Sequence, residues 1–283
     1  GSVNVSQVHY DDDDIKELGS ATALSTIIHP KNPYAPSLHM HISWTEMKIG
    51  HGYWRMMADL NPVIENKIAT DLFSECLKIV ALTEYESASK QGDKYFYIPA
   101  LGRHRGVSHF YLEEYNSNNE QVDYDLAKAV GKAVVDAYIT IVFKALEENP
   151  NPGQKAYQQQ QDYHTLYLFQ VLTLDRGTSS GLLVHDQNDL GIMGSLPSHI
   201  NKALLTTWVE KLQKPQDQLL LDILAVLPDE EPCLVNEAVK LALAKVLREY
   251  YQKNPDALAM QAQGYIIPPT VNNHVWQTNN IKR

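Results

Sequence analysis

Apolar and polar positions alternate strictly between residues 38 and 44. This alternation has the period of two that is typical of a strand with one face against the core. Its apolar side carries Leu38, Met40, Ile42 and Trp44, and its polar side carries His39, His41 and Ser43. Two imidazoles on the wet side of a strand belong more often to a solvated surface than to a site. The pattern alone leaves both interpretations open.

Further β-prone segments and several helical periods follow along the chain. Strands are expected in residues 53–62, 93–99, 106–115 and 165–174, and after Gly181. Helices are expected in residues 65–87, 124–146, near 195–212, 217–227 and 235–254. In the first helix an apolar stripe is expected to pack on the core, formed by Ile68, Leu72, Cys76 and Ile79.

The strands and helices do not alternate regularly along the sequence. This order favours an α+β fold, with a large antiparallel sheet flanked by α-helices on both faces, over a doubly wound one. From Gln216 onward the chain is strongly helical. We therefore divide it into a domain of residues 1–215 and a helical C-terminal extension, residues 216–283, packed on the same domain.

Composition and charge exclude several classes of function. The net charge of −10 argues against a nucleic-acid surface, because phosphate neutralisation needs a basic patch. The sequence has neither the long apolar run of a membrane span nor the order of a signal peptide. Cys76 and Cys233 lie far apart and fit reduced thiols. We therefore expect a cytoplasmic protein.

Generic catalytic motifs are missing from the sequence. It has no GxGxxG or GxxxxGK[ST] loop, no HExxH motif and no GxSxG elbow. The polar clusters that remain are His29, His39 and His41; Arg103, His104 and Arg105; and Asp175 with Arg176. The second cluster is more simply a charged turn than a site. The third can fix a loop at a strand end through a bidentate ion pair between its two members.

Asp59 is the carboxylate most open to a catalytic interpretation. It follows an apolar stretch, so it could be partly buried with a raised pKa, as a general base requires. It could equally cap the turn before Pro62 through its side chain.

Five motifs carry a resemblance to a known family. They are HPKNPYAPSLHMH, YWRMMADLNP, DKYFYIPALGRHRGVSHFYLEEY, AVGKAVVDAY, and LTLDRGTSSGL followed by MGSLP. In this order and spacing, over residues 3 to 200, the chain resembles the oxygen-dependent coproporphyrinogen III oxidase family.

The resemblance implies an enzyme of haem biosynthesis. Such enzymes use O₂ to decarboxylate two propionates of coproporphyrinogen III to vinyl groups, which gives protoporphyrinogen IX. The resemblance also implies a homodimer and a large sheet between helices. It implies O₂ as co-substrate and no metal or organic cofactor. The expected partners are therefore a porphyrinogen-type substrate and a second copy of the chain, with no nucleic acid and no membrane span.

Residue roles follow from the matched positions. His39 matches the proton-donor histidine of the family, and Asp59 the acidic residue expected as a base near the pyrrole nitrogens. The resemblance implies that His29 shares one cleft with these two residues. Substrate contacts are expected for Ser25, His29, His41, Asp175 and Arg176, to which we add Arg105 as a cation for carboxylates. Ala69 and Ala100 stand at two of four histidine positions of a proposed metal cluster, so no tightly bound transition metal is expected.

Several positions depart from the family pattern. Ser43 stands where the family has an arginine, and no arginine occurs between Arg176 and Lys202, where the family has another. Each lost charge-assisted contact costs roughly 1.5–3 kcal/mol of binding free energy. Other cations could replace them, namely Lys31, Arg55, Arg103 or Arg105.

Three functions stay open from the sequence. The first is a divergent coproporphyrinogen III oxidase. The second is a catalytically weakened or inactive porphyrin-binding paralogue. The third is an oxygenase or decarboxylase for a smaller, less anionic substrate. The apolar stripe of Leu219, Ile223 and Val226 must be buried against something, and with the resemblance it favours a dimer whose interface the helical extension supports.

Overall fold

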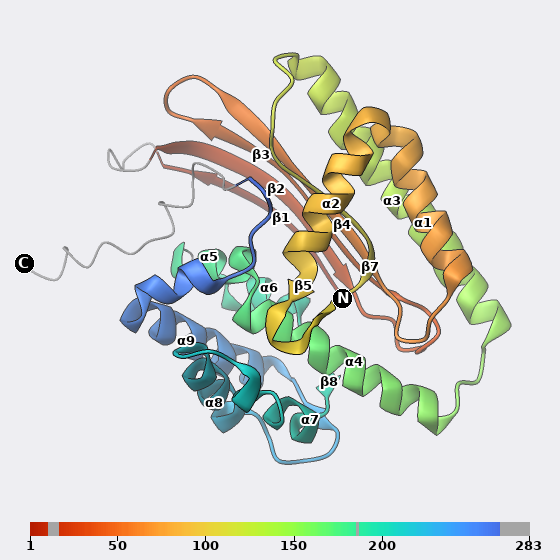
Figure 1. Cartoon of the computed structure of the whole chain (residues 1–283), viewed down its shortest axis with the longest axis vertical. Helices are drawn as coiled ribbons and strands as arrows, with labels where there is room; N and C mark the ends of the chain where they lie inside the picture. The colour runs from red at the N-terminus through yellow and green to blue at the C-terminus, as the bar shows by residue number, and fades with distance from the viewer. Residues whose placement is uncertain (11–16, 185–186, 267–283) are drawn as a thin grey trace, which may run out of the picture.

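The structure, a computed structural model, describes residues 1–10, 17–184 and 187–266. Its centre is a five-stranded antiparallel sheet in the order β1-β2-β3-β4-β7 (Figure 1). The strands are β1 (Ser2–His9), β2 (Leu18–Ile28), β3 (Ser37–Met47), β4 (Gly52–Asn61) and β7 (Val107–Tyr115). The first four pair with their neighbours in sequence, and β7 then joins the outer edge of β4.

Alternation along β3 and β4 gives the sheet one apolar and one polar face. Ile42 lies opposite Met56 in the register, and His39 lies opposite Asp59. The apolar face belongs to a core cluster that includes Leu38, Met40, Met56, Ala58, Leu60, Phe110 and Leu112. The strands predicted in 38–44, 53–62 and 106–115 are confirmed, and His39 and His41 share the polar face.

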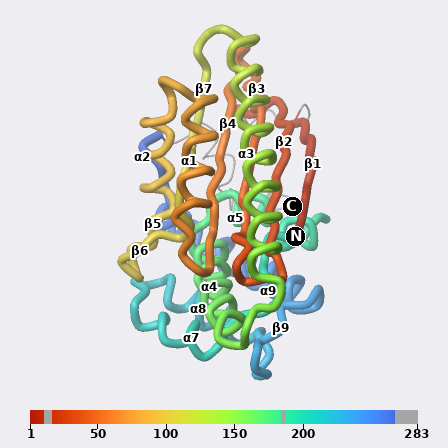
Figure 2. The backbone as a smooth tube through the Cα atoms, turned by 90° about the vertical axis from the view of Figure 1, so that its right-hand side faces the viewer, coloured from red at the N-terminus to blue at the C-terminus, as the bar shows by residue number. Residues whose placement is uncertain are grey.

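Two helices cover the apolar face, α1 (Lys67–Ala81) and α3 (Glu120–Glu148) (Figure 2). The side chain of Asn66 caps α1 by accepting a hydrogen bond from the amide of Ala69, and Asn119 caps α3 in the same way. The helix predicted in residues 124–146 is confirmed and is longer than predicted.

The predicted packing face of α1 is wrong. Its buried residues are Ala69, Phe73, Leu77 and Ala81. In contrast, Ile68 is 66% and Ile79 67% exposed. Both stripes have a helical period, so periodicity does not choose between them. The buried stripe combines a large aromatic side chain with small alanines near its ends, which lets the helix approach the sheet closely.

A third helix, α2 (Tyr85–Phe96), runs along the edge strand β7. It approaches the strand closely at Gly92, where a Cβ atom would lie 2.7 Å from the Cβ of His109 and 3.0 Å from the amide nitrogen of Phe110. Any larger residue would therefore push the helix away. The strand predicted in 93–99 is wrong for most of its length, because α2 continues to Phe96 and only Tyr97–Ile98 form β5.

A helical layer lies on the polar side of the sheet (Figure 1). It contains α4 (Gln154–Thr173) and α5 (Arg176–Val184). The strands predicted in 165–174 and after Gly181 are therefore wrong. Residues 164–173 are all buried, and a continuous apolar run does not distinguish a buried helix from a buried strand.

The C-terminal helices α8 (Gln216–Val226) and α9 (Glu237–Lys253) are confirmed where the sequence predicted them. Leu219 and Ile223 of α8 are fully buried in the same core cluster as α4 and α9. These two residues of the predicted stripe are therefore covered within one chain. The division at residue 215 stays a prediction.

The remaining elements are short. They are β6 (Arg103–His104), α6 (Asp189–Ile192), β8 (His199–Ile200), α7 (Lys202–Thr206), β9 (Cys233–Leu234), and 3-10 turns at Leu82–Glu84, Pro99–Leu101, Met193–Ser195, Val209–Lys211 and Pro255–Met260. None of the helices in the described residues is both long and apolar enough to cross a membrane. The arrangement confirms the α+β class, with helices on both faces of an antiparallel sheet.

Candidate functional site

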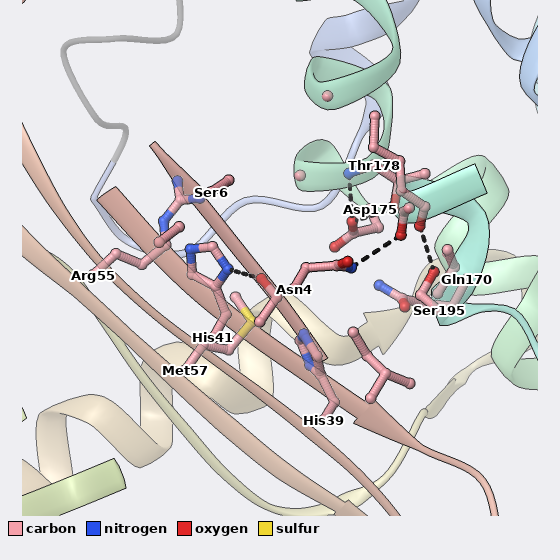
Figure 3. Close-up of a pocket in the computed structure, with 18 of the residues that line it drawn as sticks. Asn4, Ser6, His39, His41, Arg55, Met57, Gln170, Asp175, Thr178 and Ser195 are labelled. Atoms are coloured by element: carbon pink, nitrogen blue, oxygen red, sulfur yellow. Dashed lines mark hydrogen bonds between the residues drawn. The ribbon is translucent and has the colours of Figure 1, made fainter. Parts of the chain in front are cut away.

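A cavity of about 290 Å³ lies between the polar face of the sheet and the helical layer. Strands β1 to β4 supply one wall and helices α4 and α5 the other (Figure 3). The sheet wall presents Ser25, His39, His41 and Arg55, and the helical wall presents Gln170 and Asp175. The polar face that the alternation predicted is therefore one wall of this cavity.

His39 is held by a buried carboxylate. Its Nδ1 lies 2.7 Å from Oδ1 of Asp59, directly opposite in the register of β3 and β4. Hydrogen bonding at Nδ1 leaves Nε2 as the ring nitrogen that can exchange a proton with a ligand. Since His39 lines the cavity, this nitrogen is available to the site.

Asp59 lies behind His39 and is not part of the cavity wall. It is completely buried. Its Oδ1 also accepts from Nη2 of Arg105 at 3.2 Å, and its Oδ2 accepts from Nδ2 of Asn61 at 2.6 Å. These contacts make it an orienting group for His39 and a counter-charge for Arg105. Its role as a base that meets the ligand directly stays a prediction that this placement does not favour.

The expected raised pKa of Asp59 is wrong. Burial by itself would raise the pKa of this carboxyl, but the charges of Arg105 and His39 outweigh burial and lower the pKa to about 2. Asp59 is therefore ionised at neutral pH.

Arg105 is 1% exposed and reaches the cavity from the bend between β6 and β7. Its guanidinium carbon lies 4.5 Å from the ring centroid of Phe96 and 4.4 Å from that of Tyr167. The next residue, Gly106, has a φ of +75°, and a Cβ there would lie 3.0 Å from Oδ2 of Asp59. Glycine is therefore required for the turn that brings this arginine to the carboxylate.

His41 is hydrogen-bonded to two serines of the sheet. Its Nδ1 lies 2.6 Å from Oγ of Ser25, and its Nε2 lies 3.1 Å from Oγ of Ser43. Burial, together with the nearby charge of Arg55, lowers the pKa of His41 to about 3. This imidazole is neutral at physiological pH, so it offers the ligand no positive charge.

Arg55 belongs to a buried ionic network at one end of the cavity. Its Nε donates to Oε1 of Glu113 at 2.9 Å, and Nη2 of Arg176 donates to Oε2 of the same carboxylate at 3.0 Å. Burial would lower the pKa of Arg55, but the charge of Glu113 raises it. Among the four cations considered as replacements, Arg55 and Arg105 line the cavity.

The predicted ion pair between Asp175 and Arg176 is not formed. Asp175 accepts a hydrogen bond from the hydroxyl of Tyr95 at 3.0 Å and from the amide and hydroxyl of Thr178 at 2.7 and 2.8 Å. Arg176 lies behind the cavity wall with Glu113. The motif follows helix α4 and not a strand, so the two side chains leave the backbone in different directions.

His29 does not line the cavity. Its Nδ1 lies 2.9 Å from Oγ of Ser37, and its Nε2 donates to the carbonyl of Ser195 at 2.9 Å. Burial lowers its pKa to about 3, with a further contribution from His164. Because Ser195 does line the cavity, His29 supports the wall from behind. Of the three residues expected to line one cleft, His39 lines the cavity, and His29 and Asp59 lie behind the residues that form its wall.

Sequence reasoning missed two polar residues of this site. The sequence patterns assign no role to Glu113, although its ion pair with Arg55 makes it the anchor of the network. Gln170 lies within residues 165–174, which the apolar pattern predicts as a strand. A glutamine inside such an apolar run was the available signal, because buried amides need a partner.

The charged groups of the site cancel. Three arginines, Arg55, Arg105 and Arg176, face three carboxylates, Asp59, Glu113 and Asp175. In the described part of the chain, no group of three or more His, Cys, Asp or Glu residues is arranged to hold a metal ion.

Comparison with known proteins places these observations in a family. The family model described as coproporphyrinogen III oxidase matches residues 3–224. The mitochondrial oxygen-dependent coproporphyrinogen-III oxidase of Rattus norvegicus is 29% identical over 216 residues, which are 74% of this chain and 47% of that protein. The oxygen-dependent coproporphyrinogen-III oxidase of Rickettsia akari is 30% identical over 191 residues, 64% of each chain.

The mitochondrial relatives are longer than this chain. It spans about half the length of the mitochondrial relatives that it matches. The family match nevertheless covers the whole sheet and the helices that enclose the cavity. On this match, the chain belongs to the coproporphyrinogen III oxidase family.

Proposed function

We propose that the chain catalyses the O₂-dependent oxidative decarboxylation of propionate side chains of a porphyrinogen, with coproporphyrinogen III as substrate and protoporphyrinogen IX as product. One observation carries the proposal: in a member of this family, His39 lines a cavity with its Nδ1 fixed by a buried carboxylate. Such a histidine can hold and release a proton at one defined atom.

The chain's own residues would divide the work as follows. Arg105 and Arg55 would bind substrate carboxylates through N–H donors. Nε2 of His39 would exchange the proton that moves during loss of the carboxylate, while Asp59 keeps the ring in place. Each conversion of propionate to vinyl removes CO₂ and two electrons, so two conversions supply the four electrons that reduce one O₂ to water.

A second candidate is a catalytically weakened or inactive porphyrin-binding paralogue. The observation in its favour is the cancelled charge of the site, because a tetracarboxylate gains little from arginines that carboxylates already neutralise. A slow enzyme is the outcome expected if both the chemistry and this weak binding hold.

Turnover and binding separate the two candidates. Coproporphyrinogen III, reduced under nitrogen, is incubated with the purified chain in air and in nitrogen, and oxidised products are separated by chromatography. If the chain is the enzyme, protoporphyrin should form only in air, with two CO₂ released per O₂ consumed. Saturable binding of coproporphyrin III without product would instead support the paralogue.

We also propose a homodimer. An apolar groove on the far side of the sheet supports it, lined by Leu24 of β2, Ile42 of β3 and Val135 of α3. Val5 of β1 pairs with Leu24 and is 77% exposed, and Ile139 of α3 is 47% exposed. Light scattering should report twice the mass of 32.0 kDa. A mass of one chain at all concentrations would count against the dimer, and Val5→Lys should split it.

We further propose that O₂ is the only co-substrate, that no metal or organic cofactor is bound, and that the protein works in the cytoplasm. The two cysteines, Cys76 and Cys233, are both unpaired, which supports a reducing compartment. Elemental analysis of active protein should show no metal in stoichiometric amount. A stoichiometric metal that activity depends on would overturn this part.

A further inference from the structure

Gln170 is a buried amide with no hydrogen-bond partner. Its side chain is 1% exposed, it lines the cavity, and neither Nε2 nor Oε1 has a partner among the described residues. Its backbone carbonyl is used, since it accepts from the amides of Leu174 and Asp175. Buried amide groups are ordinarily paired, so an unpaired one facing a cavity indicates a missing ligand group.

Arg105 shows the same property in the same cavity. Its Nη2 donates to Asp59, but its Nε and Nη1 have no partner in the described part of the chain. The rings of Phe96 and Tyr167 lie against the guanidinium, so its remaining N–H groups are reached along its edge. A planar acceptor approaching in the plane of the guanidinium fits this geometry, and a carboxylate is such a group.

The two residues line the same cavity and are linked through Tyr167. Tyr167, whose ring contacts Arg105, precedes Gln170 by three residues on α4. Residues three apart on a helix are neighbours on one face. Figure 3 shows Gln170 on the helical wall of the cavity, across from His39 and His41 on the sheet. A carboxylate between the two walls can therefore accept from Arg105 and from Nε2 of Gln170 together.

We propose that Gln170 and Arg105 form a subsite for one carboxylate of the ligand, and that Gln170 determines specificity for that carboxylate. The other charged groups of the site are paired: Arg55 and Arg176 share Glu113, and Asp175 is held by Tyr95 and Thr178. A second carboxylate arm can reach Arg55 on the sheet wall, and the described residues that line the cavity offer no further arginine or lysine to a third or fourth arm. The choice of a propionate arm as the bound carboxylate rests on the proposed function.

The test measures binding and stability separately. Calorimetric titration of the full chain at fixed salt uses three probes: coproporphyrin III with four carboxylates, mesoporphyrin with two, and mesoporphyrin with both carboxylates converted to primary amides. The variants are Gln170→Leu and, as matched control on the exposed side of the same helix, Gln159→Leu.

Gln170→Leu should weaken the binding of both porphyrin acids about tenfold, because one hydrogen bond to a charged group is lost. It should change the affinity for the diamide less than threefold. The two acids should bind within about threefold of each other. Gln170→Leu should also raise the melting temperature, because it replaces an unpaired buried amide by an apolar side chain. Gln159→Leu should match the unchanged chain in every titration.

Two results would overturn the proposal. One is an equal loss of affinity for acids and diamide in Gln170→Leu, accompanied by a lower melting temperature, which is the signature of a structural residue. The other is a hundredfold preference for coproporphyrin III over mesoporphyrin. These binding measurements do not depend on turnover. A chain that binds the two acids as predicted but forms no product would therefore refute the proposed function and leave the carboxylate subsite intact.

Discussion

Arg55 lies directly opposite Ser43 in the antiparallel register of β3 and β4. Ser43 is the position where the family pattern has an arginine. Arg55 therefore supplies a guanidinium on the neighbouring strand, directly across from the position where the family has one. Arg55 also lines the cavity and is held by the buried carboxylate of Glu113. The sheet thus keeps a guanidinium at this end of the site although the matched residue is a serine.

A swap of the cation between strands tests this compensation. Arg55→Gly should weaken binding of coproporphyrin III about tenfold or more, because one charge-assisted contact is lost. Adding Ser43→Arg to that variant should restore most of the affinity, since the new side chain starts from the facing position. Arg103→Ala is the control, because Arg103 is exposed and does not line the cavity. Equal affinities in the single variant and the unchanged chain would show that Arg55 does not bind the ligand.

The pair of Asp59 and Arg105 should dominate the stability of the site. Asp59→Asn leaves the guanidinium of Arg105 buried without its counter-charge, which costs about 3–5 kcal/mol of unfolding free energy. Urea denaturation measures this value. His39→Asn should cost far less, because it removes a hydrogen bond and leaves the ion pair in place. Similar losses in the two variants would contradict the assigned roles.

Acid should destabilise the fold through three buried imidazoles. The pKa values of His29 and His41 are about 3 and that of His164 is about 4 in the folded chain, against 6.5 for an exposed imidazole. Below pH 6.5 the unfolded chain therefore binds more protons, so stability present at pH 7 is lost as the pH falls toward 3. Between pH 7 and pH 5 each imidazole should cost about 2 kcal/mol of unfolding free energy.

Urea denaturation of His41→Asn at pH 7 and pH 5 checks this assignment. The variant should lose about a third of this pH dependence, because one of the three buried imidazoles is gone. A urea midpoint in the unchanged chain that is the same at both pH values would show that these imidazoles are not buried in their neutral form.

The packing face of α1 can be tested with two alanine variants. Phe73→Ala should lower the unfolding free energy by about 3–5 kcal/mol, because Phe73 is fully buried. Ile79→Ala should change it by less than about 0.5 kcal/mol, because Ile79 is 67% exposed. If Ile79→Ala proved the more costly change in a monomeric sample, α1 would pack on the stripe predicted from sequence.

Local patterns predicted the parts of the fold that depend on neighbours in sequence. Alternation along residues 38–44 predicted β3 and put His39 and His41 on one face, and the β-prone residues 53–62 predicted β4. The helical character of residues 124–146, 217–227 and 235–254 predicted α3, α8 and α9. The buried run of residues 165–174 was assigned to a strand because its burial on all sides removes the periodicity that distinguishes helix from strand.

The site was less predictable because its partners come from distant segments. The apolar neighbours of Asp59 suggested burial and a raised pKa, but Arg105 arrives from another turn and reverses the direction of the shift. The facing of Ser43 and Arg55 follows from the hairpin register, which depends on where the turn between β3 and β4 lies. Gln170 joins the site only because α4 is a helix that lies over the sheet.

The central claim is that His39 exchanges a proton with the ligand in the cavity. Its most direct test is the rate of protoporphyrin formation from coproporphyrinogen III in air, compared between the unchanged chain, His39→Gln, and His104→Gln, an exposed histidine outside the cavity. We expect measurable turnover, a loss of about a hundredfold or more in kcat for His39→Gln with folding retained, and no change for His104→Gln. Equal rates in all three proteins, or no product from an unchanged chain that binds the porphyrin, would contradict it.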